Sequence, residues 1–308
     1  MPLHTATPAW RSAPLSQSRE VWLKLEHCQP SGSFKIRGIG RLCEQQAALG
    51  KRRFVASSGG NAGLAVAYAA RELGLAATIY VPETTSPLMR EKIVAMGAEV
   101  VVAGSAWDQS DQHARQRAES AEVAYIPPFD HPAIWQGHAT LVEESIDQIP
   151  QPELVLVAVG GGGLLCGVAA GLRAGNWRGV ELVAVETCGA ASLAAAVSAG
   201  RPVSIARIDS VATTLGARRV CQGALDVVQR QPTRLAQVSD AAAVAACLRF
   251  ADDHGVLVEP ACGAALSLVY DDHAVLGQAQ RVAVVVCGGA GVSRALLARW
   301  AEQFSLSC

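Results

Sequence analysis

The sequence predicts an α/β fold: an open, twisted and mainly parallel sheet with helices on both faces, together with a smaller α/β domain. Strand-length apolar runs alternate with longer Ala-rich stretches that are typical of helices. Several of the runs are continuous in Val, Leu and Ile, as in strands that helices cover on both faces. Glycine-rich segments follow several of these runs, at the strand ends where open α/β sheets bind ligands.

The apolar runs predict strands at residues 21–26, 53–56, 78–81, 100–103, 154–159, 181–186 and 281–286. Ala-rich stretches such as residues 62–73 and 241–252 predict helices between them. Three prolines within residues 125–132 interrupt the pattern and predict a crossing between domains, and a second crossing is expected near residues 37–40. The expected division is therefore a large discontinuous domain of residues 1–40 and 132–308 and a small domain of residues 41–131.

Composition narrows the class of protein. The chain has 308 residues, of which 50% are hydrophobic and 17% charged, as in a well-packed globular enzyme. Its net charge is −1 and its basic residues are spread along the sequence, so neither a nucleic-acid partner nor a membrane partner is expected. The apolar runs are shorter than the roughly 18 residues that a membrane helix needs, and residues 1–14 lack an apolar signal core. A soluble, cytoplasmic protein with a small-molecule substrate is expected.

The cysteines agree with a reducing compartment. The sequence has no CxxC pair, and an odd number of thiols cannot pair completely within one chain. We expect most of the thiols to be small, buried hydrophobic groups. The nine cysteines are Cys28, Cys43, Cys166, Cys188, Cys221, Cys247, Cys262, Cys287 and Cys308.

A run of four glycines directly after the predicted strand 154–159 is the strongest ligand signal. Residues 160–165 (Gly-Gly-Gly-Gly-Leu-Leu) should open a helix, where backbone amides and the helix dipole favour a phosphate. The spacing does not give GxGxxG, because Leu165 or Cys166 stands where the last glycine would be, and it is not GxxxxGK. A single phosphate is therefore favoured over a dinucleotide or a nucleoside triphosphate. The alternative is a turn that serves packing alone.

Three further segments carry reactive or polar groups. Lys35 stands beside the aromatic Phe34 and could form a Schiff base with a carbonyl cofactor, although a single lysine is more often only a solvated charge. Residues 57–63 (Ser-Ser-Gly-Gly-Asn-Ala-Gly) lie between a predicted strand and a helix, where they could bind a carboxylate or simply cap the helix. Cys287 ends the last predicted strand before two glycines, either close to a ligand ring or as a buried structural thiol.

Taken together, these motifs resemble those of the pyridoxal phosphate (PLP)-dependent L-serine/L-threonine dehydratases, which have the tryptophan synthase β-like fold, known as fold type II. The segments that carry the resemblance are residues 30–38, 57–63, 125–130, 135–138, 160–165, 258–264 and 287–289. The short, animal-type serine dehydratases are the branch that the chain resembles most. The resemblance implies β-elimination of water from L-serine, and from L-threonine, which gives ammonia with pyruvate or 2-oxobutyrate. It also implies a homodimer with a role in amino-acid catabolism.

The resemblance assigns roles to individual residues. Lys35 would hold PLP covalently and move the substrate α-proton, Phe34 would pack against the ring, and Cys287 would face the pyridine nitrogen. The residues that would hold the cofactor phosphate are Gly160, Gly161, Gly162, Gly163 and Leu164. Those that would receive the substrate carboxylate are Ser58, Gly59, Gly60 and Asn61, of which Asn61 would also bond the ring 3-oxygen. A potassium ion would be bound by the Glu186 side chain and by the carbonyls of Gly160, Ala190, Leu215 and Ala217.

A thiol near the pyridine nitrogen cannot keep that nitrogen protonated as a carboxylate would, so loss of the β-substituent is favoured over longer-lived chemistry at the α-carbon. Gly59 has no side chain where serine racemases supply a hydroxyl, so elimination should dominate over racemisation. Two departures from the family pattern stand out. Thr214 could shift the preferred amino acid, and the pair Ala290-Gly291 could loosen or reshape contacts around the cofactor ring. Little sequence follows Cys287, so no inhibition by isoleucine through a C-terminal regulatory domain is expected.

Two alternatives remain at this point. The first is another PLP reaction, either β-replacement or serine racemisation, and the second is a non-enzymatic α/β protein that binds a phosphate or a nucleotide.

Overall fold

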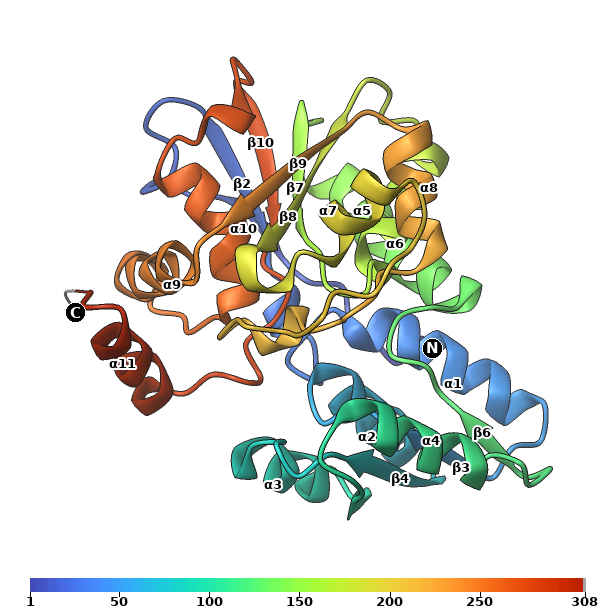
Figure 1. Cartoon of the computed structure of the whole chain (residues 1–308). Helices are drawn as coiled ribbons and strands as arrows, with labels where there is room; N and C mark the ends of the chain where they lie inside the picture. Colours follow the sequence, from blue (N-terminus) through green and yellow to red (C-terminus); the bar gives the residue numbers. More distant parts are fainter. Residues whose placement is uncertain (307–308) are drawn as a thin grey trace. The chain divides into compact units, whose positions relative to one another are not determined.

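The computed structural model describes residues 1–306 and divides the chain into two compact units (Figure 1). Unit 1 comprises Met1–Thr5 and Gln29–His138, and unit 2 comprises Ala6–Cys28 and the chain from Ala139 onward. Cys308 lies outside the described residues. The division into residues 1–40 with 132–308 and residues 41–131 stays a prediction.

Unit 1 is built on a four-stranded parallel sheet with the strand order β5-β4-β3-β6. Its strands are β3 (Arg53–Ala56), β4 (Ala76–Val81), β5 (Glu99–Val102) and β6 (Val123–Tyr125). Its helices are α1 (Lys35–Ala48), α2 (Asn61–Glu72), α3 (Pro87–Ala95), α4 (Trp107–Arg117) and the first part of α5 (Pro132–Gln148). The sequence places one helix between successive parallel strands, as right-handed crossovers require.

Unit 2 is built on a six-stranded sheet with the order β1-β2-β10-β7-β8-β9, in which only β1 runs antiparallel. Its strands are β1 (Ala9–Arg11), β2 (Glu20–Lys24), β7 (Leu154–Ala158), β8 (Glu181–Thr187), β9 (Thr233–Val238) and β10 (Arg281–Val285). Its complete helices are α6 (Gly163–Ala174), α7 (Ser192–Ala199), α8 (Gln222–Arg230), α9 (Asp240–His254), α10 (Pro260–Tyr270) and α11 (Arg294–Gln303). Helices α9 and α10 lie on one side of this sheet and α6 and α8 on the other (Figure 1). The predicted fold class is confirmed.

Each sheet changes its direction of growth at an inner strand. In unit 2 the chain proceeds from β7 outward to β8 and β9, then returns to place β10 on the other side of β7. In unit 1 it proceeds from β3 to β4 and β5, then places β6 on the other side of β3. Ligands of open α/β sheets bind at the carboxyl ends of the strands beside such a switch. The two switch points are therefore the places to look for function.

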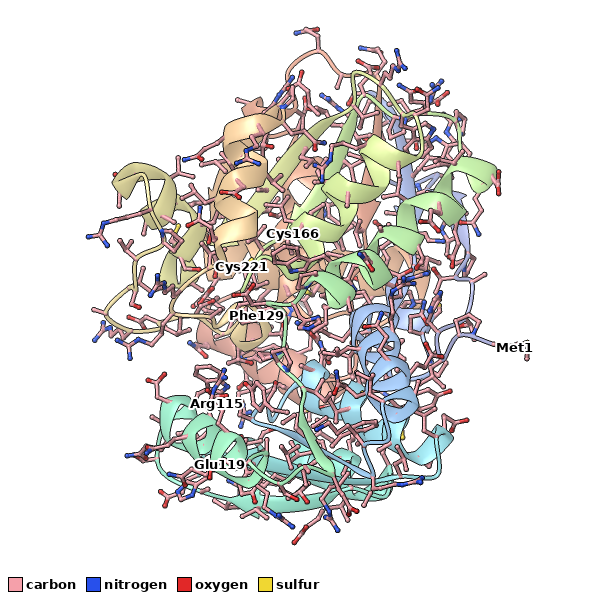
Figure 2. All side chains as sticks on the ribbon, turned by 90° about the vertical axis from the view of Figure 1, so that its right-hand side faces the viewer. Met1, Arg115, Glu119, Phe129, Cys166 and Cys221 are labelled. Atoms are coloured by element: carbon pink, nitrogen blue, oxygen red, sulfur yellow. The ribbon has the colours of Figure 1, made fainter. Side chains whose placement is uncertain are left out.

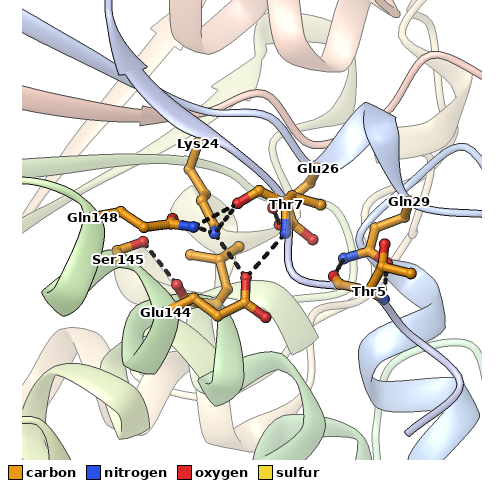
Figure 3. A network of polar contacts seen from close by, with 9 residues as sticks. Thr5, Thr7, Lys24, Glu26, Gln29, Glu144, Ser145 and Gln148 are labelled. Atoms are coloured by element: carbon orange, nitrogen blue, oxygen red, sulfur yellow. Dashed lines mark hydrogen bonds and ion pairs between the residues drawn. The ribbon is translucent and has the colours of Figure 1, made fainter.

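The core of unit 2 includes a continuous apolar strand, since all five residues of β7 are buried. A polar network also lies inside this unit (Figure 3). Lys24 at the end of β2 is 2% exposed, and its Nζ donates to Thr7 O, Glu144 Oε2 and Gln148 Oε1 at 2.7–2.8 Å. Three acceptors satisfy the three protons of a buried ammonium. No helix within the described residues is long and apolar enough to cross a membrane.

Candidate functional site

Lys35 is placed by the start of α1 and by the segment that follows β6. It is the first residue of the helix and half-buried, and its Nζ donates a hydrogen bond of 2.6 Å to the carbonyl oxygen of Pro128. The same Nζ lies 5.3 Å from the centroid of the Phe34 ring. Because Pro128 follows β6, the lysine is held near the switch point of the unit 1 sheet. The structure therefore brings together the predicted pair Phe34 and Lys35.

His138 is a further ionisable group beside this pair. Its ring meets that of Phe34 edge to face with centroids 4.8 Å apart, and the residue is fully buried. Among the described residues neither ring nitrogen has a hydrogen-bond partner. Burial holds the pKa of His138 well below its ordinary value, and the positive charges of Lys35 and Arg37 lower it further. The imidazole is therefore neutral and adds no charge next to the lysine.

The predicted carboxylate-binding loop lies between β3 and α2. It belongs to the same switch point as Pro128, because β3 and β6 are neighbouring strands. Ser58, Gly59 and Gly60 are half-buried, and Asn61 begins α2 with 8% of its surface exposed. Loop amides and the first amides of α2 point to a site for an anionic group, because the N-terminus of a helix carries a partial positive charge. These four predicted residues are contiguous at the carboxyl end of β3.

A polar cluster that the sequence did not reveal fixes the start of this loop. Asp111 on α4 accepts hydrogen bonds from the Ser57 hydroxyl at 2.6 Å and the Tyr125 hydroxyl at 2.5 Å, and Arg115 pairs with its other oxygen at 2.6 Å. Burial by itself would raise the pKa of the Asp111 carboxyl, but the three hydrogen bonds together lower it below its ordinary value. The ionised carboxylate thus ties β3, α4 and β6 together immediately before Ser58.

In unit 2, the glycine run follows β7 and leads into α6 as predicted. Gly162 adopts φ 92°, a left-handed conformation that L side chains rarely take, and α6 begins at the next residue. The first hydrogen bond of the helix runs from Cys166 N to Gly162 O at 3.0 Å. The amides of Gly163, Leu164 and Leu165 therefore precede the intrahelical pattern, as the N-terminal amides of helices do. They form the part of the loop best suited to a phosphate.

Two buried thiols lie behind this loop. The Sγ atoms of Cys166 and Cys221 are 3.8 Å apart, and the backbone of Cys221 donates to Gly161 O at 3.0 Å (Figure 2). None of the eight described cysteines forms a disulfide, and six of them are buried, which confirms that most are core groups.

The residues that the resemblance assigns to potassium all lie in unit 2. A Cβ at Gly160 would lie 3.0 Å from Leu215 Cα and 3.2 Å from Leu215 O, so the glycine run and the Leu215 backbone are in close contact. Glu186 is 2% exposed on β8, and its two oxygens accept from the amides of Leu193 and Ala194 at 2.7 and 2.9 Å. Burial raises the pKa of Glu186 to about 7, although the two amides act in the opposite direction.

The other two members of this set are Ala190, which ends the 3-10 helix Cys188–Ala190, and Ala217, whose amide already donates to Leu215 O at 2.7 Å. Within the described residues, no group of three or more His, Cys, Asp or Glu side chains is arranged to bind a metal ion.

Cys287 follows β10, the strand that pairs directly with β7. Val284 lies opposite Leu156, so three residues later in the same register Cys287 reaches the level of Val159, next to the glycine run. Its Sγ lies 3.4 Å from that of Cys262, whose thiol also bonds to Gly288 O at 3.0 Å. The hydrogen bond with Cys262 and burial raise the pKa of Cys287 well above its ordinary value. The thiol is therefore neutral and protonated.

The structure also locates Gly291 and Thr214, which depart from the family pattern. Gly291 donates its amide to the buried carboxylate of Glu259 at 2.7 Å, and a Cβ there would lie 3.1 Å from that oxygen. A glycine at this position thus allows a close backbone approach. Thr214 is exposed in the short turn Thr213–Leu215.

These features fit PLP in three respects. A half-buried lysine beside an aromatic ring can form an imine bond, a left-handed glycine leads into a helix N-terminus suited to a phosphate, and a neutral thiol follows the strand next to that loop. No acidic side chain is needed at the thiol for this fit. The residues present are therefore compatible with the cofactor.

Comparisons with known proteins agree with this chemistry. The family model described as "Pyridoxal-phosphate dependent enzyme" matches residues 1–288. The chain is 45% identical over 320 residues to the human L-serine dehydratase/L-threonine deaminase, covering 99% of this chain and 97% of that protein. A fungal L-serine ammonia-lyase from Rhizomucor miehei superposes with a TM-score of 0.94 at 37% identity, covering 99% of this chain and 100% of that chain. Maize serine racemase, at 24% identity and a TM-score of 0.87 over 98% of this chain and 92% of its own, shares the fold. The chain belongs to the pyridoxal phosphate-dependent enzymes of fold type II, and within them to the L-serine/L-threonine dehydratase family.

Proposed function

We propose that the protein is an L-serine/L-threonine ammonia-lyase, which removes water from L-serine or L-threonine and releases ammonia with pyruvate or 2-oxobutyrate. The observation that carries the proposal is the placement of Lys35, which is half-buried beside Phe34 and donates to the carbonyl oxygen of Pro128 near a sheet switch point. The relatives named for this reaction match nearly the whole chain, which supports the choice of elimination over other PLP reactions.

The proposed roles follow from the groups present. When bound, PLP supplies the electron sink that makes the α-proton of an amino acid removable. Lys35 would bind the cofactor and, once released from it, take the α-proton on Nζ. The loop from Ser58 to Asn61 would bind the substrate carboxylate, and residues 160–164 the cofactor phosphate. The neutral Cys287 thiol would face the ring nitrogen without stabilising positive charge there, which favours prompt departure of the β-hydroxyl.

The reaction itself is tested by following pyruvate and 2-oxobutyrate with L-serine, L-threonine and their D-forms as substrates. We expect keto acid from both L-amino acids and none above background from the D-amino acids. Formation of D-serine at a rate comparable with pyruvate would identify a racemase, and products that appear only with an added thiol nucleophile would identify a β-replacement enzyme. A chain that binds no PLP would contradict both the proposal and these alternatives.

We further propose that potassium binds at Gly160, Glu186, Ala190, Leu215 and Ala217 and stabilises the glycine run. Carbonyl and carboxylate oxygens are the ligands that hard cations prefer. Two features support the site: the close contact of Gly160 with the Leu215 backbone, and a buried Glu186 that a bound cation would help to keep ionised. The proposal also includes a cytoplasmic homodimer, for which the family resemblance is the support.

Replacing sodium by potassium should raise turnover several-fold, because a cation of the right size would hold the carbonyls of the phosphate loop in place. Glu186→Gln should remove most of this response. Glu181→Gln provides a matched control, since Glu181 begins the same strand but pairs with Arg234 at 2.8 Å and should leave the response intact. Equal initial rates in potassium-free lithium buffer and in potassium buffer would reject the site.

A further inference from the structure

Two adjacent serines open the proposed substrate loop, and their hydroxyls have different partners. Ser57 is completely buried, and its hydroxyl donates to Asp111 Oδ1 at 2.6 Å. Ser58 is half-buried, and its Oγ accepts from the amide of Gly60 at 3.4 Å. A serine hydroxyl has one proton to donate. The proton of Ser57 is therefore taken, whereas that of Ser58 has no acceptor among the described residues and is available to a ligand.

Tyr125 donates a second proton to the same oxygen of Asp111. It lies on β6, beside β3 in the sheet, and its hydroxyl is 2.5 Å from Asp111 Oδ1. Burial and the hydrogen bond to this carboxylate raise the pKa of Tyr125, so the phenol keeps its proton. Oδ1 of Asp111 thus accepts one hydroxyl from each of the two strands that flank the switch point.

The other oxygen of Asp111 faces an exposed partner. Arg115 pairs with Oδ2 at 2.6 Å, but its side chain is 59% exposed. Ion pairs at the surface contribute little, because water competes for both charges. We therefore expect the two hydroxyls on Oδ1, and not the arginine, to hold the start of the loop.

The two sides of Ser58 differ in the same sense. A Cβ at Gly63 on α2 would overlap the carbonyl oxygen of Ser58, so the backbone of the loop lies directly against the helix. A Cβ at Gly60 would instead meet nothing within 4 Å except Ser58 Oγ, at 3.9 Å. The hydroxyl of Ser58 therefore borders open space, while its backbone is packed.

We propose that Asp111 is a positioning residue for the substrate carboxylate: it accepts the hydroxyl protons of Ser57 and Tyr125 and so fixes the loop with the Ser58 hydroxyl free to donate to the substrate. The inference rests on the proposed function, in which residues 58–61 bind that carboxylate. The carboxylate is bound in the ground state and in the transition state alike. Loss of the anchor should therefore raise KM and leave kcat nearly unchanged.

The first test is steady-state kinetics with L-serine. Asp111→Ala should raise KM about tenfold, as expected when a hydrogen-bonded charge that holds a binding loop is lost, while kcat stays within about twofold. Asp111→Asn should return KM to within about threefold of the wild type, because its amide oxygen can accept from the same two hydroxyls. Arg115→Gln is the matched control and should leave KM unchanged. Equal KM values in Asp111→Ala and Arg115→Gln, or a fall in kcat alone, would overturn the inference.

The second test separates positioning from a general disturbance of the fold. The PLP-loaded protein is titrated with L-alanine, which has the α-carboxylate but no hydroxyl to lose, and with L-alaninamide, which lacks the carboxylate. Asp111→Ala should weaken L-alanine about tenfold and L-alaninamide less than about twofold, as followed by the absorbance of the cofactor. Equal losses for the two probes would overturn the inference.

Two milder variants cover the case in which Asp111→Ala does not fold. Ser57→Ala and Tyr125→Phe each remove one of the two protons and should each weaken L-alanine selectively; if both bind it as the wild type does, Asp111 does not position the loop. A wild-type protein that releases no keto acid from L-serine would instead refute the proposed function. The L-alanine titration would still decide the role of Asp111, because it requires no elimination.

Discussion

Lys35→Ala should abolish both the visible absorbance of the bound cofactor and the release of keto acid, with turnover reduced by more than about 10³-fold. Nζ of Lys35 is the proposed point of covalent attachment and the proposed base, so its removal takes away two functions at once. The chain has four lysines, and the others are poorly placed to substitute. Lys24 is enclosed by three acceptors, and Lys51 is bonded to Ala121 O in an exposed position. Absorbance spectra and a keto-acid assay measure the two losses.

Lys51→Ala is the matched control and should retain both the absorbance and the activity. Borohydride reduction of the wild type followed by peptide mapping should place the modified lysine at position 35. A reduced adduct on any other lysine of the wild-type protein would contradict the assignment of Lys35.

Gly162→Ala should cause the second large loss, this time of affinity for PLP. A Cβ at this position would overlap Ala224 Cβ and lie 2.9 Å from Val220 Cγ2, and the backbone holds φ at 92°. The left-handed conformation costs about 1–2 kcal/mol and overpacking about 1–3 kcal/mol more. If the loop yields while the rest of the fold holds, the combined cost of about 2–5 kcal/mol weakens phosphate binding by roughly 30-fold or more. Titration of the apoenzyme with PLP, followed by absorbance, measures the change.

Gly179→Ala separates the two causes. Gly179 also has a positive φ, of 78°, but a Cβ there would meet nothing within 4 Å. This variant should show the backbone cost in its free energy of unfolding and bind PLP as the wild type does. If Gly162→Ala also binds PLP with wild-type affinity, the glycine run is not the phosphate site.

Six of the seven strands that the sequence predicts are inner strands, β5 at a sheet edge being the exception, and burial explains why the inner strands could be predicted. Runs such as β3 and β7 are apolar because helices or neighbouring strands cover both faces, and their predicted positions agree with the structure within one residue. The unpredicted strands β1, β6 and β9 all lie at sheet edges. Two have three residues, and β9 (Thr-Arg-Leu-Ala-Gln-Val) is half polar, so their pairing depends on a neighbour that the local sequence does not name.

Some residues of the candidate site could likewise be located from the sequence, and others could not. The loop from Ser58 to Asn61 and the glycine run could be located from the sequence, because glycines and polar residues next to an apolar run mark a strand end. Lys35 is singled out only by the resemblance to the dehydratase motifs, since a single lysine carries no such signal. The role of Asp111 could not be predicted, because its partners Ser57 and Tyr125 are 54 and 14 residues away in the sequence.

The neutral Cys287 thiol should react slowly with oxidants and alkylating reagents. Oxidants and alkylating reagents attack the thiolate, and a buried thiol with a raised pKa presents almost none of it. Among the described cysteines, Cys28 and Cys188 are the exposed ones, so these two are the thiols that a reagent in solution can reach directly. The thiol that is proposed to face the cofactor is thus shielded from reagents that act at the surface.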